Sequence, residues 1–191
     1  MNLFPEILKN TLLQIAGKVL SVLIGVASIA LITRSLGVTD YGHYTTIINY
    51  LLIVGVLIDG GLHLTMIQLT EKEESQANKE KIIHNILSLR LITASLALTI
   101  GIVVAMFLPY TPSVKIGIAI ISFSTLFNGL IQLLTGIFQI KLKMIAVIKA
   151  EIYRSLFYLV ALLAIFYFFP KNLYLILIAM AVSYGLNVIL L

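Results

Sequence analysis

Polar side chains recur at helical spacing within the first long apolar stretch of the sequence. Asn10, Gln14, Lys18 and Ser21 follow one another at steps of four, four and three residues, which places them on one face of a helix. A lysine inside a membrane helix either extends its side chain back to the lipid headgroups or faces a hydrated cavity. Because Asn10 and Gln14 share its face, we favour the cavity, where the ammonium group of Lys18 would meet an anion.

A single carboxylate lies in the second apolar stretch, where Asp59 is followed by Gly60, Gly61 and His63. An ionised carboxylate at mid-membrane depth is costly unless it is paired or hydrated. The sequence leaves two interpretations open. Asp59 either couples transport to protons or sodium, with His63 one turn away as its partner, or it bonds a neighbouring helix that the glycines allow to approach closely.

A third set of polar residues lies in a stretch that carries no charge. Its members recur at steps of three and four residues: Thr125, Asn128, Gln132, Thr135 and Gln139. Such a face suits hydrogen bonds between helices and equally the lining of a polar channel. Arg90, about two turns into its own segment, has the same two interpretations as Lys18. We expect one substrate cavity lined by Asn10, Gln14, Lys18, Arg90, Asn128 and Gln132.

Two further patterns favour structural roles. Gly17, Ser21 and Gly25 form a series of small residues at steps of four, continued by Ser28, which is typical of close helix packing. The fifth apolar segment begins with charged and aromatic residues that are typical of anchors at the membrane surface: Lys149, Glu151, Tyr153, Arg154 and Tyr158.

The sequence carries no pattern of an enzyme or of a metal site. It has no nucleophile with paired acids, no HExxH and no phosphate-binding glycine loop. His43, His63 and His84 lie in different regions without the spacing of metal ligands, and the absence of cysteine excludes disulfides and thiolate metal sites. We therefore predict no catalytic residue, no metal and no cofactor.

Composition places these residues in a membrane protein. Hydrophobic residues make up 60% of the chain and charged residues 11%, with a mean hydropathy of +1.08. A soluble domain carries about 25% charged residues, whereas lipid accepts such an apolar surface. The net charge of +5 does not indicate a nucleic-acid partner, because the cations flank apolar segments and no basic run alternates with aromatic residues.

Charges, prolines and turn residues divide the chain into six apolar segments. Each has about 20 residues or more, enough for a helix to cross a hydrocarbon core of about 30 Å. No segment alternates with the period of two that a barrel strand requires. We predict an all-α polytopic bundle of about six transmembrane helices in a single domain, at residues 10–34, 44–70, 82–108, 116–140, 145–169 and 172–191, with a hydrophilic loop over 71–81.

Lysine and arginine predict the orientation of this bundle. With the N-terminus in the cytoplasm, ten of the 13 lysines and arginines lie on or near the inner side, and only Arg34, Lys115 and Lys171 lie outside. This bias follows the positive-inside rule and predicts a multi-pass protein of the cytoplasmic membrane. No charge or polar tail follows the last segment, so we expect the chain to be the N-terminal half of a longer transporter.

Several motifs resemble the beginning of Wzx-type polysaccharide flippases, which belong to the multidrug/oligosaccharidyl-lipid/polysaccharide exporter superfamily. The most specific is the pattern Leu-Gly-x-x-x-Tyr-Gly-x-Tyr over residues 36–44. The pattern of residues 10–18, the Asp-Gly-Gly-Leu element at 59–62 and the basic joint at 139–144 are also similar to that family. The resemblance covers most of the chain in order and topology.

The resemblance implies two six-helix bundles around a central cavity that opens alternately to either side of the membrane. The cargo would be a lipid-linked oligosaccharide, and glycan-synthesis enzymes would be further partners beside the membrane lipids. Because this chain has only six segments, either a second half or a second copy would complete the cavity.

Two alternative functions stay open at this stage. A multidrug cation antiporter of the same superfamily would favour acids in the cavity, where this chain offers a lysine. A non-transporting membrane subunit that organises glycan-synthesis enzymes would use the polar stripes as protein interfaces.

Overall fold

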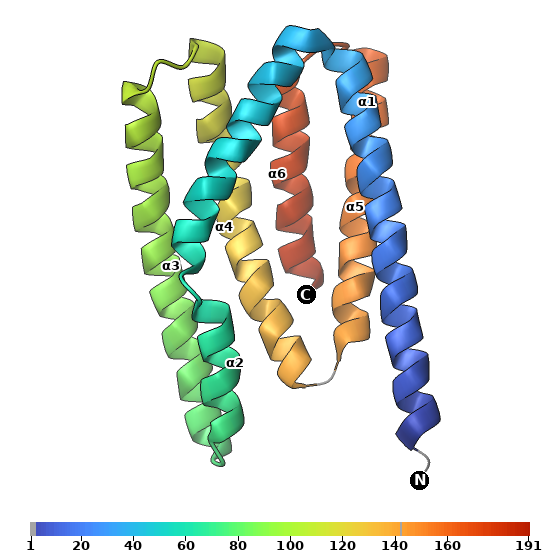
Figure 1. Cartoon of the computed structure of the whole chain (residues 1–191), viewed down its shortest axis with the longest axis vertical. Helices are drawn as coiled ribbons and strands as arrows, with labels where there is room; N and C mark the ends of the chain where they lie inside the picture. The colour runs from blue at the N-terminus through green and yellow to red at the C-terminus, as the bar shows by residue number, and fades with distance from the viewer. Residues whose placement is uncertain (1–2, 142) are drawn as a thin grey trace.

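The computed structural model describes residues 3–141 and 143–191, with side chains described for residues 11–56, 58–141 and 143–191. This part of the chain is helical and contains no strand, which confirms the all-α prediction. The described residues form six helices (Figure 1): α1 (Leu3–Asp59), α2 (Leu62–Lys72), α3 (Gln76–Phe107), α4 (Pro112–Ile140), α5 (Met144–Phe168) and α6 (Leu173–Leu190).

Helix α1 consists of two legs that meet at Gly37. The φ of Gly37 is 73° and its ψ is 177°, a conformation that glycine adopts without the steric cost of a Cβ atom. The apolar part of α1, Thr11–Val56, has 46 residues, and as a straight helix it would extend about 70 Å, more than twice the hydrocarbon core. The bend sends the second leg back in the opposite direction (Figure 1). The two segments predicted at 10–34 and 44–70 are therefore joined by a bend at Gly37.

A second interruption follows the second leg. Helix α1 ends at Asp59 and α2 begins at Leu62, and the intervening Gly60 and Gly61 have φ values of 46° and 78°. Both values lie in the left-handed region that favours glycine. The prediction of one continuous helix over 44–70 is therefore wrong at this point, because two consecutive glycines in that conformation end one helix before the next begins.

The remaining helices follow the predicted segments more closely. Helix α3 begins at Gln76, so that most of the predicted loop over 71–81 is helical and only residues 73–75 are not. Helix α4 begins with Pro112, whose missing N–H costs no hydrogen bond in a first turn. Asn172 caps α6, since its Oδ1 accepts a hydrogen bond from the backbone N of Leu175 at 3.1 Å.

Small residues bring the helices close together at particular points. A methyl group at Gly17 of α1 would overlap the side chain of Ile148 in α5, so the predicted small-residue packing is confirmed there. At Gly25 a methyl group would meet nothing within 4 Å. Ser21 and Ser28 of the same series are buried, with 6% and 3% exposed, so Gly25 is the member that leaves open space beside it.

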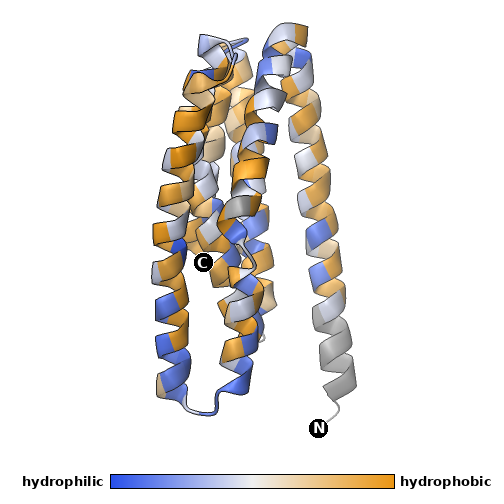
Figure 2. Cartoon of the chain, turned by 60° about the vertical axis from the view of Figure 1, so that its left-hand side comes forward, coloured by the Kyte–Doolittle hydropathy of each residue, from blue (hydrophilic) through white to orange (hydrophobic). Residues whose placement is uncertain are grey.

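Hydrophobic residues predominate along most of the length of the helices (Figure 2). Five helices are long and apolar enough to cross a membrane, namely α1, α3, α4, α5 and α6, and the bend gives α1 two legs. In α5 only 11% of the most apolar stretch is buried. Phe123 and Val160, both 63% exposed, are examples of apolar side chains that only lipid would cover favourably.

Candidate functional site

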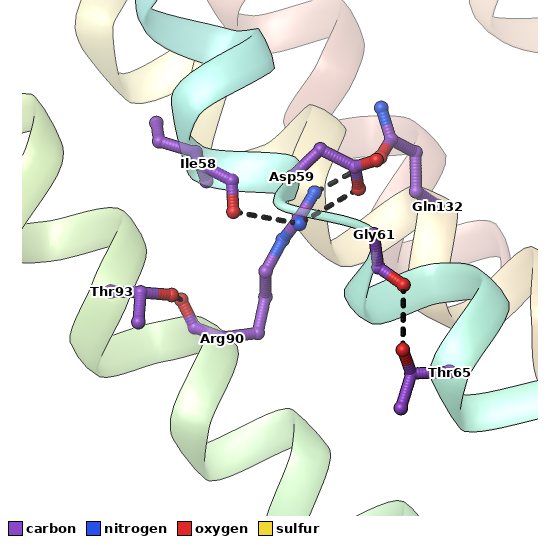
Figure 3. Close-up of polar contacts among 7 residues, drawn as sticks. All are labelled: Ile58, Asp59, Gly61, Thr65, Arg90, Thr93 and Gln132. Atoms are coloured by element: carbon purple, nitrogen blue, oxygen red, sulfur yellow. Dashed lines mark hydrogen bonds and ion pairs between the residues drawn. The ribbon is translucent and has the colours of Figure 1, made fainter. Parts of the chain in front are cut away.

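The most deeply buried charge among the described side chains belongs to Arg90 of α3, which is 2% exposed. Its Nη1 donates hydrogen bonds to Asp59 Oδ1 at 2.9 Å and to the carbonyl oxygen of Ile58 at 3.0 Å. Its Nη2 donates to Gln132 Oε1 at 2.9 Å (Figure 3). The guanidinium group therefore ties the end of α1 and the middle of α4 to α3. A buried charge of this kind requires such partners, because an unpaired one would cost several kcal/mol.

Helix α4 has a glycine where the guanidinium group lies against it. A Cβ atom at Gly129 would lie 3.1 Å from Arg90 Nε and 3.4 Å from its Nη2. The absence of a side chain at 129 therefore leaves the space that the guanidinium group occupies beside Gln132.

The interruption between α1 and α2 supplies two of the acceptors for Arg90. In a continuous helix the carbonyl of Ile58 would accept from the backbone N–H four residues later, but Gly60 and Gly61 end the helix first. Ile58 and Asp59 thus lie at a helix end, where the carbonyl oxygen of Ile58 has no donor within its own helix. The side chain of Asp59 is 39% exposed and lines a hollow between α1 and α4.

Asp59 bonds a neighbouring helix through Arg90, which is one of the two interpretations that the sequence left open, and His63 is not its partner. The two glycines place His63 on a separate helix, where its imidazole packs against α4. A Cβ atom at Gly136 would lie 3.0 Å from His63 Cε1.

A second ion pair joins the first leg of α1 to α5. Lys18 Nζ lies 2.7 Å from Glu151 Oε1, and the two side chains are 64% and 25% exposed. Gln14, Lys18 and Glu151 line a second hollow, which Asp59 does not reach. An exposed pair of this kind contributes about 1 kcal/mol or less to stability in water.

One turn along α5, Arg154 has aromatic and hydroxyl neighbours. Its Cζ lies 4.9 Å from the ring centroid of Tyr184 in α6, a distance typical of a cation–π contact. Its Nη2 donates to Ser155 Oγ at 3.3 Å. No carboxylate lies within ion-pair distance of Arg154 among the side chains that the structure describes.

These groups line two adjoining hollows. The first has a volume of about 530 Å³ and contains Asp59, Arg90 and Gln132 in its lining. The second has a volume of about 570 Å³ and contains Lys18, Glu151 and Arg154. Asn128 and Tyr184 line both hollows, so the two hollows adjoin and are together called the cavity, which is lined by residues of α1, α3, α4, α5 and α6.

Charged residues of both signs line this cavity, with one more cation than carboxylates. Its lining includes three cations, Lys18, Arg90 and Arg154, and two carboxylates, Asp59 and Glu151. No group of three or more His, Asp or Glu residues close enough to hold a metal ion occurs among the described residues.

Comparison with known protein families decides the class of molecule. A family model described as polysaccharide biosynthesis protein matches residues 7–191. The chain belongs to this family. Comparison with curated proteins and with solved structures gave no match.

The polysaccharide biosynthesis family is that of the Wzx-type polysaccharide exporter flippases, so the predicted resemblance is confirmed. Its members are transporters and not enzymes. Together with the long apolar helices, membership makes this chain a multi-pass membrane protein concerned with polysaccharide transport.

The structure of this family member brings most of the predicted site residues together. Gln14, Lys18 and Asn128 line the second hollow, and Arg90, Asn128 and Gln132 line the first, together with Asp59. The side chain of Asn10 lies outside the described residues, and His63 lies outside both linings.

Among the lining residues that sequence reasoning missed are Glu151, Arg154 and Tyr184. Glu151 and Arg154 were interpreted as anchors at the membrane surface. Their spacing of three residues was the available signal, since it places both on one face of α5. No signal in the sequence indicated Tyr184.

Proposed function

We propose that this chain is the N-terminal half of a flippase that moves a lipid-linked oligosaccharide across the cytoplasmic membrane by alternating access. The observation that carries the proposal is the cavity between Lys18 and Arg90, whose lining includes three cations and two carboxylates inside an otherwise apolar bundle. A cargo whose sugar is joined to a lipid through a diphosphate has an anionic head, and its lipid tail can remain in the bilayer.

The position of the cavity supports an alternating-access mechanism. The larger cluster of buried core residues includes Ile32, Ile47, Ala105, Ile118 and Ile176, which lie toward the end of the bundle that holds the bend of α1. Only a smaller buried cluster, Met66, Ile86 and Leu133, lies toward the other end. The cavity residues lie toward the opposite end, which holds the N-terminus. With the N-terminus in the cytoplasm, as the positive-inside rule predicts, this is a conformer that receives cargo from the cytoplasmic side.

The pairing of Asp59 bears on the source of energy. A sodium ion or proton that used Asp59 would compete with the guanidinium group of Arg90, which lies 2.9 Å from the carboxylate. A membrane potential acts directly on an anionic cargo, with about 2.3 kcal/mol per elementary charge for each 100 mV. We therefore assign the driving force to the membrane potential.

The two alternative functions have less support. A cation antiporter would need a cavity with an excess of carboxylates, whereas cations are in excess here. A subunit that only organises enzymes would not need a hydrated interior, because polar stripes used as interfaces would be packed against a partner.

The test is transport by the full-length protein in vesicles that contain a lipid-linked oligosaccharide. Lys18→Ala should reduce translocation at least tenfold while expression and thermal stability stay unchanged, because Lys18 is the most exposed cation of the cavity. Lys72→Ala, which changes an exposed lysine at the end of α2, is the matched control and should translocate normally. Normal translocation by Lys18→Ala would remove Lys18 from the mechanism.

A further inference from the structure

The two ion pairs of the cavity differ in how easily a ligand can open them. Arg90 is 2% exposed and donates hydrogen bonds to three acceptors. Lys18 is 64% exposed and has Glu151 as its hydrogen-bond partner. A ligand that enters the second hollow therefore meets the Lys18–Glu151 pair as a contact that can be exchanged.

We infer that Glu151 is a specificity-determining residue that competes with the cargo for Lys18, so that the site retains a diphosphate and rejects a singly charged phosphodiester. The inference rests on the proposed function and adds to it a reason why the cavity prefers one anionic lipid over another. Discrimination of this kind commonly depends on a repulsive element as well as an attractive one.

The charges around Lys18 explain the discrimination. A phosphodiester that displaced Glu151 would replace one anionic contact of Lys18 with another. It would also leave the carboxylate of Glu151 unpaired beside a second negative charge. Exchanging Glu151 for a phosphodiester at Lys18 therefore brings no net electrostatic gain.

A diphosphate gains a second cation in the same hollow. Arg154 lines that hollow with Lys18 and is held by Tyr184, 4.9 Å from its guanidinium carbon. Among the described side chains it has no carboxylate partner to displace. A diphosphate can pair with Lys18 and Arg154 at once, and the second ion pair compensates for the loss of the Lys18–Glu151 contact. A singly charged headgroup has no second charge to pair with Arg154.

Such discrimination matters in a bilayer because anionic phospholipids surround the protein and are concentrated at the membrane surface. The second hollow is lined by residues of α1, α4, α5 and α6, and an exposed lysine there without a competitor would attract the commonest anion nearby.

The experiment measures the binding of labelled farnesyl diphosphate to the purified protein in lipid nanodiscs. One set of discs contains phosphatidylcholine alone, and the other also contains phosphatidylglycerol. The wild-type protein should bind the probe with the same Kd in both sets. Glu151→Gln keeps the shape of the side chain without its charge, so this variant should bind about tenfold more tightly in neutral discs and lose the gain when phosphatidylglycerol is present.

Two further arms keep the result specific. Glu74→Gln removes an exposed carboxylate from the connection between α2 and α3 and should bind as the wild type does. Inorganic pyrophosphate, added as a competitor, should displace the probe if the site recognises the diphosphate. A probe that stays bound would show that the tail alone holds it, and this would overturn the inference.

The remaining outcomes separate this inference from the proposed function. If the wild type does not bind the probe even in neutral discs, the proposed function fails and the inference fails with it. If the wild type binds but Glu151→Gln has the same affinity and the same tolerance of phosphatidylglycerol, only the inference is overturned. Glu151→Ala has the same expected result and replaces Glu151→Gln if that variant does not fold.

Discussion

The guanidinium group of Arg90 lies against the backbone of Gly129, so closely that a Cβ atom there would approach Arg90 Nε to 3.1 Å. Three hydrogen bonds hold the guanidinium group in place, so it cannot move aside without loss. Arg90 of α3 therefore keeps its position only if residue 129 of α4 has no side chain.

Gly129→Ala should destabilise the protein by about 1–3 kcal/mol, the usual cost of adding a methyl group to a packed interior. The variant should also lose transport, because Arg90 would be pushed away from Asp59 or Gln132. Thermal unfolding in detergent and vesicle transport measure the two effects. A Gly129→Ala protein with unchanged stability and transport would contradict the contact.

The pair of Arg90 and Asp59 should show strong coupling in a double-mutant cycle. Arg90→Met leaves Asp59 without its partner, and Asp59→Asn removes the charge that Arg90 requires. We expect each single variant to lower the free energy of unfolding by about 2–4 kcal/mol, below the upper range for buried pairs because Asp59 is 39% exposed. The double variant should be less destabilised than the two losses added together.

Additive losses in that cycle would contradict a direct interaction. Arg90→Lys serves as the matched control for charge. It should remain clearly destabilised, because an ammonium group cannot reproduce the planar arrangement of donors that reaches Asp59, Ile58 and Gln132.

The packing of α1 on α5 at Gly17 should be sensitive to one methyl group. Gly17→Ala would place that group on the Ile148 side chain and should lower stability by about 1–3 kcal/mol. Adding Ile148→Ala should restore part of the loss by removing the obstructing atoms. Gly25→Ala is the matched control, since nothing lies within 4 Å of its Cβ position. It should be neutral or slightly stabilising, because alanine favours a helix over glycine by about 1 kcal/mol.

The cavity should be hydrated, whereas the outer surface of the same helix should not be. The chain has no cysteine, so single cysteines can be introduced without removing others. Asn128→Cys and Phe123→Cys both lie at exposed positions of α4, one in the cavity lining and one on the apolar surface. A water-soluble maleimide should label the first at least tenfold faster. Equal rates would contradict a solvated interior and with it the proposed passage of a charged headgroup.

Most of the helical architecture could be predicted from the sequence, because the apolar segments are long and charges separate them. Gln14, Lys18, Asn128 and Gln132 could be assigned to a cavity since regular spacing puts polar residues on one face. These inferences depend only on the period of a single helix.

The parts that could not be predicted depend on contacts between segments or on the conformation of glycine. Gly60 and Gly61 are compatible with a continuous membrane helix as well as with a break, and spacing alone does not distinguish the two. The partnership of Arg90 with Asp59 follows from that break. Glu151 lies 133 positions from Lys18, and no local pattern connects them.

The break after Asp59 has a consequence for how this segment can vary. If Gly60 and Gly61 were replaced by residues that continue the helix, the carbonyl of Ile58 would accept the amide of Leu62 and no longer be free for Arg90. The arginine would then keep its charge in the interior with one acceptor fewer. A homologue that closes this gap in the helix should therefore also lack an arginine at the position of Arg90, so the two features should be gained or lost together.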